Sequence, residues 1–364
     1  TGYYALRTNV SGNYNSAYGT YSMRNNSTGS FNTANGYYSL ASNVTGSYNT
    51  ASGSSSLRLN STGTRNAAHG YGALYFNTTG YQNSAIGMYA GYRNSTGYHN
   101  SSVGYTSQFN ISTGYQNSAV GVGAGYGITT GYQNSSVGYR ALYRTTTSNS
   151  NTAIGNQAGF YNQTGSQNTY LGANAGPTAN SSYANSMALG YNASVGASNQ
   201  VRVGNSSVSS IGGQVGWTTV SDGRFKENVK SNVAGLSFIM ELNPVTYNLN
   251  AEALRNKLEN KDSVEVSNEE IESMIQKYNF VQSGFVAQDV EIAAKKVGYS
   301  FSGVDAPKNE NDIYGLRYSE FVVPLVKATQ EQQELIQKQQ MKIENQDALI
   351  QELIKRLEAL EANK

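Results

Sequence analysis

The residues able to do acid–base chemistry are concentrated after a hexad at residues 221–226, Ser-Asp-Gly-Arg-Phe-Lys. No Asp, Glu or Lys precedes Asp222, whereas all 23 acidic and 17 of the 25 basic residues follow from it on. Within the hexad, the Ser221 hydroxyl could attack a carbonyl with the Lys226 amine as base, provided that packing desolvates the Lys. A Ser and a Lys five residues apart are by themselves more often structural, so the pair needs support from its surroundings.

Three further motifs follow the hexad in order: Asn-Val at 228–229, Leu-Asn-Pro-Val-Thr-Tyr at 242–247 and Gly-Phe-Val-Ala-Gln-Asp-Val at 284–290. Together they resemble the C-terminal intramolecular chaperone domain of phage tail fibres and endosialidases, the S74 peptidase family, over about residues 221–364. The resemblance implies that Ser221 and Lys226 form a catalytic pair that cuts the chain at the domain boundary. It favours the bond between Ser221 and Asp222.

Ring size limits which bond the Ser221 hydroxyl can attack. It reaches the carbonyl before it through a five-membered ring, whereas its own carbonyl would require a strained four-membered ring. Cleavage after Ser221 would therefore need water or the Ser of a neighbouring chain, and the sequence leaves the bond open. We interpret Arg224 and Asp289 as structural residues, in an ion pair or a packing contact.

The first part of the chain is a repeat of 17 residues, with consensus Thr-Gly-Tyr-Gln-Asn-Ser-Ala-Ile/Val-Gly as at 79–87. Asn recurs at every step of 17 from Asn15 to Asn168, and Gly from Gly19 to Gly172. A period this short, rich in Gly, Asn, Ser and Thr, predicts one coil of a parallel β-solenoid. We expect stacked Asn side chains to form a hydrogen-bonded ladder.

Each coil contains few apolar residues: Ala85 and Ile86, with Leu74 just before them, are nearly all that one coil offers. Three chains that share one core would bury more apolar surface than a single chain. This predicts a homotrimer. The Asn-Ser-Ala-Ile-Gly motif also resembles the repeats of trimeric autotransporter adhesin heads of the YadA type, which implies a trimeric parallel β-roll. The present period is longer, and most coils lack one residue of that motif.

The repeats contain no carboxylate, Lys or Cys, which excludes a two-carboxylate glycosidase there. The two histidines, His69 and His99, are interpreted as tolerated replacements at repeat positions, too few for a metal site. One position is always aromatic over four coils, and we expect these rings to pack on neighbouring coils. Alternatively, they form a face that binds glycans or another surface. The residues are Tyr81, Tyr98, Tyr115 and Tyr132.

The limits of the remaining segments are set by the end of the 17-residue period and by a change of composition. Pro177 ends the 17-residue period, and we interpret 177–220 as two closing coils and a cap that includes Trp217. Residues 221–323 have the composition of a small α+β domain. Its predicted helices cover 233–242, 252–261, 267–278 and 289–297, and its predicted strands 245–249, 280–287 and 314–318.

Residues 324–364 contain neither Gly nor a second Pro, and predict one long helix that begins at Pro324. Apolar residues recur every seven positions, with Gln or Leu three residues after each. This heptad pattern predicts a coiled coil, and Ile with buried Gln is compatible with three strands. Two strands, or one helix packed on its own domain, are the alternatives. The first set is Ile336, Ile343, Ile350 and Leu357, and the second Gln339, Gln346, Leu353 and Leu360.

Features of the whole chain exclude further classes of function. It lacks Cys, no apolar run approaches the roughly 20 residues of a membrane span, and no signal peptide is evident. The eight arginines before Asp222 are widely spread, which argues against nucleic acid. Because the chain starts without Met and within a repeat, we interpret it as the C-terminal part of a longer polypeptide. We expect neither a cofactor nor a metal.

These observations predict an extracellular homotrimeric fibre of a virion tail, an injection device or a bacterial surface. Its repeat shaft (1–176), closing coils and cap (177–220), chaperone domain (221–323) and coiled coil (324–364) follow in order. Any enzymatic activity would be self-cleavage. The alternative is a surface- or glycan-binding adhesin that keeps its C-terminal domain as a permanent trimerisation foot. An enzyme acting on external substrates is not expected.

Overall fold

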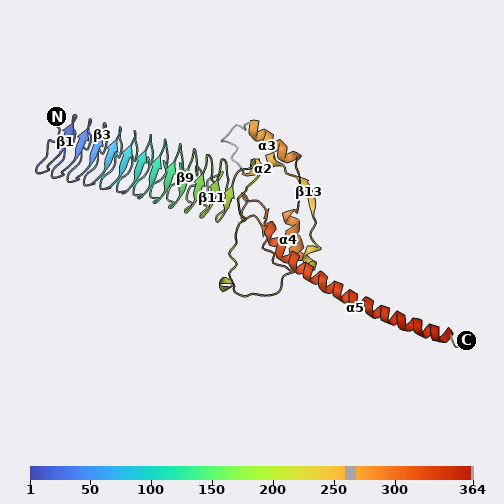
Figure 1. Ribbon diagram of the computed structural model, residues 1–364. Coiled ribbons are helices and arrows are strands. Elements are labelled where there is room, and N and C mark those ends of the chain that lie inside the picture. The colour runs from blue at the N-terminus through green and yellow to red at the C-terminus, as the bar shows by residue number, and fades with distance from the viewer. Residues whose placement is uncertain (259–267, 362–364) are drawn as a thin grey trace. The chain divides into compact units, whose positions relative to one another are not determined.

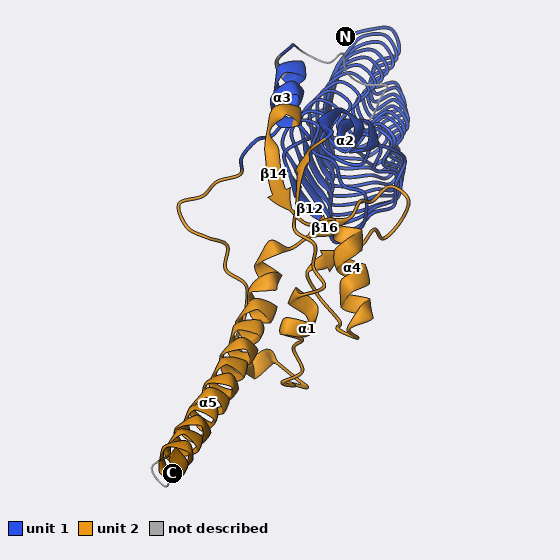
Figure 2. Cartoon of the chain, turned by 90° about the vertical axis from the view of Figure 1, so that its right-hand side faces the viewer, with its two compact units in different colours: residues 1–210, 250–277 blue, residues 211–249, 278–364 orange. Residues whose placement is uncertain are grey.

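The computed structural model of the chain describes residues 1–258 and 268–361, apart from the side chain of Glu269. The chain forms two compact units, drawn in different colours in Figure 2. The first comprises Thr1–Ser210 with Asn250–Lys277, and the second Ile211–Leu249 with Tyr278–Lys364. The return of 250–277 to the first unit is not evident from the sequence.

Residues 1–210 fold as the expected parallel β-solenoid, with one short strand in each coil (Figure 1). Neighbouring strands in sequence are neighbours in a single 12-stranded sheet within this segment. Each strand has only three residues, because turns occupy the rest of the coil. The strands are β1 (Ser16–Tyr18), β2 (Thr33–Asn35), β3 (Thr50–Ser52), β4 (Ala67–His69), β5 (Ser84–Ile86), β6 (Ser101–Val103), β7 (Ser118–Val120), β8 (Ser135–Val137), β9 (Thr152–Ile154), β10 (Thr169–Leu171), β11 (Met187–Leu189) and β12 (Val201–Val203).

The strand register follows the sequence period and changes where the rhythm changes. Ser84 pairs with Ser101, one full period of the repeat away. Thr169 then pairs with Met187, and Met187 with Val201. The last two coils are therefore one residue longer and three shorter than the 17-residue repeat. The change of period falls within 177–220, which the sequence analysis interprets as two closing coils and a cap.

Close stacking favours glycine at two positions that recur along the solenoid. Gly87 has φ +131°, and an added Cβ would lie 2.6 Å from the carbonyl oxygen of Gly104 in the next coil. At Gly97 an added Cβ would lie 2.4 Å from the carbonyl oxygen of Gly114. Both contacts are shorter than any carbon can tolerate against a backbone oxygen. Steric exclusion thus explains the ladder from Gly19 to Gly172 and favours glycine in a second one, from Gly12 to Gly165, which only Ser148 interrupts.

The solenoid interior is closed within a single chain. The middle residue of each strand is usually Ala and points inward, and a second inward column holds Met23, Leu40, Leu57 and Leu74. Asparagine amides fill the remaining space. Each coil contains few apolar residues, and buried asparagine amides fill the rest of its interior. Ile86, one of these few apolar residues, points outward.

The predicted asparagine ladder is present. Asn100 accepts a hydrogen bond from the backbone N–H of Asn117 at 3.0 Å, and its own amide donates to the carbonyl of Gly114 at 2.8 Å. A second ladder had no counterpart in the sequence interpretation. In it, Asn94 donates to Asn77 Oδ1 at 2.8 Å, and Asn77 to Asn60 Oδ1 at 2.7 Å. Stepping by 17 from Asn26 would have found it.

The rest of the chain is mainly helical. In sequence order its elements are η1 (Gly223–Phe225), α1 (Leu236–Ile239), β13 (Val245–Asn248), α2 (Ala251–Leu258), α3 (Asn268–Asn279), β14 (Val281–Gly284), α4 (Ala287–Lys296), β15 (Val304–Asp305), β16 (Gly315–Leu316), η2 (Tyr318–Phe321) and α5 (Val322–Glu361). β13 pairs with β14, and β15 with β16, both antiparallel.

Most predicted elements of this region are present but shorter. The helix expected at 233–242 is confined to α1, and the strand expected at 280–287 ends at Gly284. The helices expected at 252–261 and 267–278 correspond to α2 and α3. Residues 259–261 and 267, and the last three residues of the predicted coiled coil, lie outside the described residues.

The second unit has its own small core. Phe238 of α1 is fully buried with Val290 of α4 and Phe321 of η2, and partly buried aromatic rings surround them. The α1 backbone N–H of Leu236 donates to the carboxylate of Glu331 in α5 at 2.7 Å. These contacts fix the beginning of α5 to the domain.

The segment just after β12 contacts the part of α3 that belongs to the same unit. The Ser273 hydroxyl donates to the carbonyl of Ser207 at 2.9 Å, and the Lys277 amine donates to that of Ser206. Partial burial there lowers the pKa of Lys277. Trp217, the expected capping residue, is 93% exposed in the single chain. α3, and not Trp217, supplies the hydrogen bonds to the carbonyls of Ser206 and Ser207 described above.

Candidate functional site

A short 3₁₀ turn, η1, positions the two residues expected to do chemistry. The Asp222 carboxylate caps it by accepting the backbone N–H of Arg224 at 2.9 Å. The Arg224 guanidinium also reaches that carboxylate, at 2.5 Å. Hydrogen bonds from the Arg224 side chain and then its backbone hold the pKa of Asp222 below its ordinary value. The turn reverses the chain and brings residue 226 back toward residue 221.

The predicted Ser–Lys pair is in contact. The Lys226 Nζ donates a hydrogen bond to the Ser221 Oγ at 2.9 Å. This distance allows proton exchange, because a nucleophile and its base must lie within hydrogen-bond reach. The amine acts here as the donor. Base catalysis requires the reverse arrangement, in which a neutral amine accepts the hydroxyl proton.

Both members of the pair are exposed to solvent in the single chain. Neighbouring apolar side chains are also uncovered, with Val220 84%, Phe225 75% and Val229 79% exposed. Desolvation that would favour a neutral Lys amine is therefore absent from the isolated chain. A surface that covered this segment would supply it.

Arg224 and Asp289, both expected to be structural, are not partners of one another in any described contact. Arg224 pairs with Asp222, its neighbour in the turn. Asp289 lies exposed in the first turn of α4, where a negative charge favours the helix dipole. Arg224 thus forms an ion pair within η1, with Asp222 and not with Asp289.

The four predicted surface tyrosines form a regular stack. Tyr81, Tyr98, Tyr115 and Tyr132 have successive ring centroids 4.9, 4.9 and 4.8 Å apart, with interplanar angles of 1°, 6° and 3°. The expectation that they pack on neighbouring coils is confirmed. At this spacing each inner ring has both faces covered by its neighbours, so a sugar can stack only on the outer face of a terminal ring. The exposed parts are ring edges and hydroxyls.

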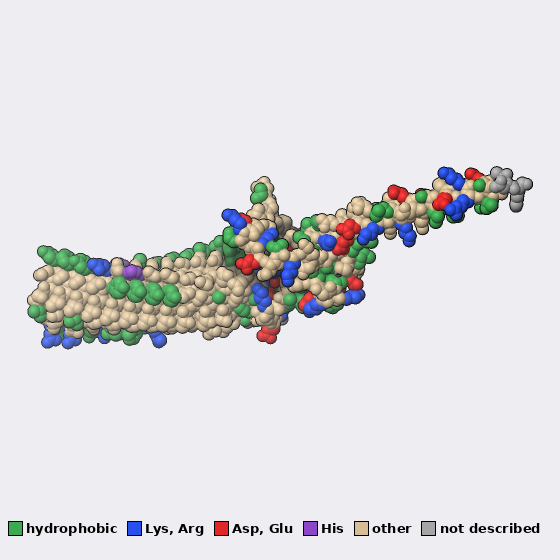
Figure 3. Space-filling model, turned by 90° about the horizontal axis from the view of Figure 1, so that it is seen from below, with side chains coloured by type: hydrophobic (Ala, Val, Ile, Leu, Met, Phe, Trp, Pro, Cys, Tyr) green, Lys and Arg blue, Asp and Glu red, His purple; other side chains and the backbone are tan. Residues whose placement is uncertain are grey.

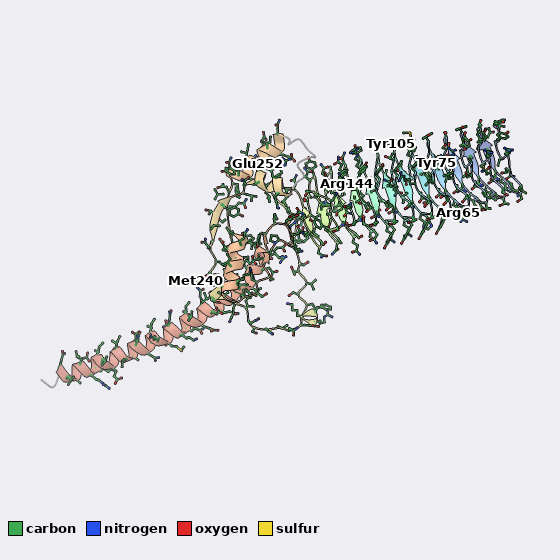
Figure 4. The ribbon with its side chains drawn as sticks, turned by 180° about the vertical axis from the view of Figure 1, so that it is seen from behind. Arg65, Tyr75, Tyr105, Arg144, Met240 and Glu252 are labelled. Atoms are coloured by element: carbon green, nitrogen blue, oxygen red, sulfur yellow. The ribbon has the colours of Figure 1, made fainter. Side chains whose placement is uncertain are left out.

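A longer aromatic row was missed by the sequence interpretation. Five rings stack in consecutive coils from Tyr92 to Phe160, and the ring of Tyr75, labelled in Figure 4, lies tilted next to that of Tyr92. The same repeat position holds Arg7, Arg24 and Arg58 earlier in the chain. The side chains of Arg7 and Arg24 lie over the rings of Tyr4 and Tyr21, at 4.5 and 5.3 Å from the centroids. Figure 3 shows basic but no acidic side chains on the visible face of the solenoid.

The histidines behave as repeat substitutions. His69 is the exposed third residue of β4, and His99 Nε2 lies 2.7 Å from the Gln82 Oε1 of the preceding coil. Within residues 1–258 and 268–361, His, Cys, Asp and Glu side chains form no group of three suited to a metal ion. In the same part of the chain, no helix combines the length and apolarity that crossing a bilayer requires.

Comparison with known proteins identifies one region of the chain. Residues 221–299 match the peptidase S74 family, described as the chaperone of endosialidase. The match begins at Ser221 and includes the Ser–Lys pair, η1, α1 and the β13–β14 ladder. No curated protein and no solved structure matches the chain. The sequence resemblance to the S74 family is thereby confirmed for this region.

Proposed function

We propose that residues 221–299, as a chaperone-of-endosialidase region, belong to a domain that assembles this chain into a homotrimeric fibre and then detaches by self-cleavage. The solenoid, 1–176 with closing coils and a cap at 177–220, would be the mature shaft. The domain at 221–323 and the coiled coil at 324–364 would be the assembly device. The fibre would work outside the cell, as part of a virion tail, an injection device or a bacterial surface.

The apolar seam of α5 carries this proposal. Ile336, Ile343, Ile350 and Leu357 are 50–61% exposed in the single chain, along one side of a 40-residue helix. A single helix that leaves such a seam in water lacks the burial that stabilises long helices. Copies of the same helix would cover it. The buried Gln339 and Gln346 layers would then favour one register and a defined number of strands.

If the α5 helices associate first, they would set the register in which the shafts of the chains pack. Coils of one chain are nearly identical, so copies could pair one coil out of step with little change in contacts. A coiled coil that joins the chains at one end would align them before the shafts pack. Non-local β structure forms slowly, which makes such alignment valuable.

Cleavage would make assembly irreversible. Three chains meeting around the segment 211–230 would cover its exposed apolar residues, and with them Lys226. That burial would favour the neutral amine, which could then accept the proton of the Ser221 hydroxyl. Attack on the carbonyl of residue 220 would pass through a five-membered ring, break its C–N bond as the Ser221 amine takes the proton, and leave an ester that water hydrolyses to cut the chain. Cleavage after Ser221 would use a neighbouring chain's hydroxyl or water.

Intact mass measurement of the purified chain beside a Ser221→Ala variant tests the cleavage step. The parent is expected to give two fragments that separate near Ser221, and the variant a single mass. A Lys226→Met variant serves as the matched control for the base and should also stay whole. One uncut mass from the assembled parent would contradict self-cleavage.

The second candidate is a surface- or glycan-binding adhesin that keeps the C-terminal domain as a foot. The regular aromatic rows with flanking arginines favour it, because they present hydroxyls and cations in a fixed pattern. Binding through ring edges would depend on Tyr hydroxyls. A Tyr98→Phe, Tyr115→Phe double variant would then lose binding to a glycan panel while its stack, and its stability, stay intact. Equal binding by parent and variant would count against this candidate.

A further inference from the structure

The outer face of the solenoid sheet carries an aliphatic row with no role in the proposal so far. Each strand points its first and third residues outward and its middle residue inward, as in β5. From β5 to β12 the third residue is Ile, Val or Leu in every strand. In β1–β4 the same position holds Tyr18, Asn35, Ser52 and His69. The row therefore begins sharply at the fifth strand.

Six of these eight side chains are exposed in the single chain, and Val103 and Leu189 are half-buried. Exposed fractions lie between 39% and 47% for Ile86, Val120, Val137, Ile154, Leu171 and Val203. A second row follows two residues later, beyond the turn glycine, with exposed fractions of 40–47%. It contains Met88, Tyr105, Val122, Tyr139 and Tyr191.

The two rows are large enough for a stable interface. At these exposed fractions they present on the order of 800 Å² of side-chain surface, close to what one partner contributes to a specific protein complex. A monomeric soluble protein rarely leaves an apolar patch of this extent in water. Some partner surface is therefore expected to cover it.

We propose that the partner is a second copy of this chain, and that the fibre's solenoids pack against one another along β5–β12. The row repeats once per coil, so a partner must repeat with the same pitch to fill it over eight strands. Another copy of the solenoid does so by construction. The inference rests on the proposed trimer and specifies which surface of the shaft joins the chains.

Charge supports this choice of partner. In a parallel, in-register assembly about an axis, side chains from the same repeat position meet at the same height. Charged residues there would face like charges. The solenoid has eight arginines before Asp222, and none falls in either row. The first residue of each strand from β5 to β10 is Ser or Thr, small enough to permit close approach.

The polar start of the row limits the contact. Asn35, Ser52 and His69 would pair poorly across an apolar interface, so the apolar contact along this row is expected to begin at β5. This difference between the first four coils and the later ones provides a matched control, because the same repeat position can be substituted in both parts. Asn35 and Val137 are the third residues of β2 and β8, and both are exposed.

Single cysteines test the inference, because the chain has none of its own. Val137→Cys and Asn35→Cys are each made in the full-length Ser221→Ala chain, folding is checked by circular dichroism, and a short bismaleimide is added. Val137→Cys is expected to give mostly cross-linked chains on a denaturing gel, and Asn35→Cys at least fivefold less. Light scattering on the same samples reports the number of chains.

The outcomes separate the inference from the proposed function. Trimers in which Val137→Cys cross-links no better than Asn35→Cys would overturn the surface assignment and leave the trimer in place. Monomers would remove both. A second pair, Val120→Lys and Asn35→Lys, checks the result without cross-linking. The first is expected to weaken association at least tenfold, the second not measurably, and equal effects would contradict the inference.

Discussion

The solenoid and helix α5 are both built from sequence repeats, yet they complete their cores in different ways. In the solenoid, Ala85 and Asn83 are buried by the coils above and below them in the same chain. In α5, Ile343 is 50% exposed, since a helix has no second layer of its own to cover its side. A stacked repeat thus supplies its own neighbour, whereas a heptad repeat needs another chain. Dependence on partner chains should therefore be strongest in α5.

The largest expected effect is the loss of the solenoid fold on substitution of a stacking glycine. Gly87→Val combines an unfavourable φ with a Cβ contact to the next coil, at a cost above about 4 kcal/mol. We expect no cooperative thermal transition by circular dichroism in residues 1–210. Thr96→Ala, exposed in the following turn, is the control and should melt as the parent does. A normal transition in the Gly87→Val variant would contradict the stacking argument.

The next effect separates the two regions. Ile343→Lys places a charge in the seam of every chain at the same height, which should abolish trimers at micromolar concentration while the solenoid stays folded. Light scattering and circular dichroism measure the two properties. Ala348→Lys lies outside the seam and should remain trimeric. If both variants associate alike, the seam is not the contact between chains.

A smaller effect is expected when one amide is removed from the interior ladder. Asn100→Ala deletes a donor to Gly114 and an acceptor for Asn117, and leaves buried backbone groups unpaired. The cost should be about 2–4 kcal/mol. Urea unfolding followed by circular dichroism measures it. Asn156→Ala, at an exposed position, should change stability little, and an equal loss in both would argue against a structural ladder.

The smallest effect concerns the turn at the candidate site. The pKa of Asp222 is depressed by Arg224, so this contact favours the folded turn at neutral pH and is lost as pH falls through the lowered pKa. In Arg224→Gln the pKa of Asp222 should rise toward its ordinary value. Nuclear magnetic resonance titration of the Asp222 side chain reports it. An unchanged pKa would mean that the ion pair does not persist in solution.

The solenoid was predictable because a fixed period repeats the same constraint many times. Its Asn and Gly ladders are enough to identify the coil, its turns and its register. Pairing between different positions of the interior is not visible in the sequence. Ser102 replaces the usual Ala and Gln108 the usual Leu, and the two bond to one another at 2.7 Å. The bond joins two substitutions that lie six residues apart in the same coil.

The C-terminal region was less predictable, because its element limits depend on contacts distant in sequence. The Phe285 N–H donates to the Tyr318 hydroxyl at 3.1 Å, beyond the end of the β13–β14 ladder at Gly284. At the candidate site, the pairing of Ser221 with Lys226 was expected from the resemblance to the S74 family, since a spacing of five residues is by itself more often structural. The ion pair of Asp222 with Arg224 was not predicted, although the two lie within the same hexad.

The molar mass of the Ser221→Ala chain in solution tests the central claim most directly, since this variant keeps the chaperone region attached. Light scattering should give three times the chain mass of 39.1 kDa, independent of concentration in the micromolar range. A monomer mass over that range would contradict the account, because the α5 seam would then be exposed in a stable single chain.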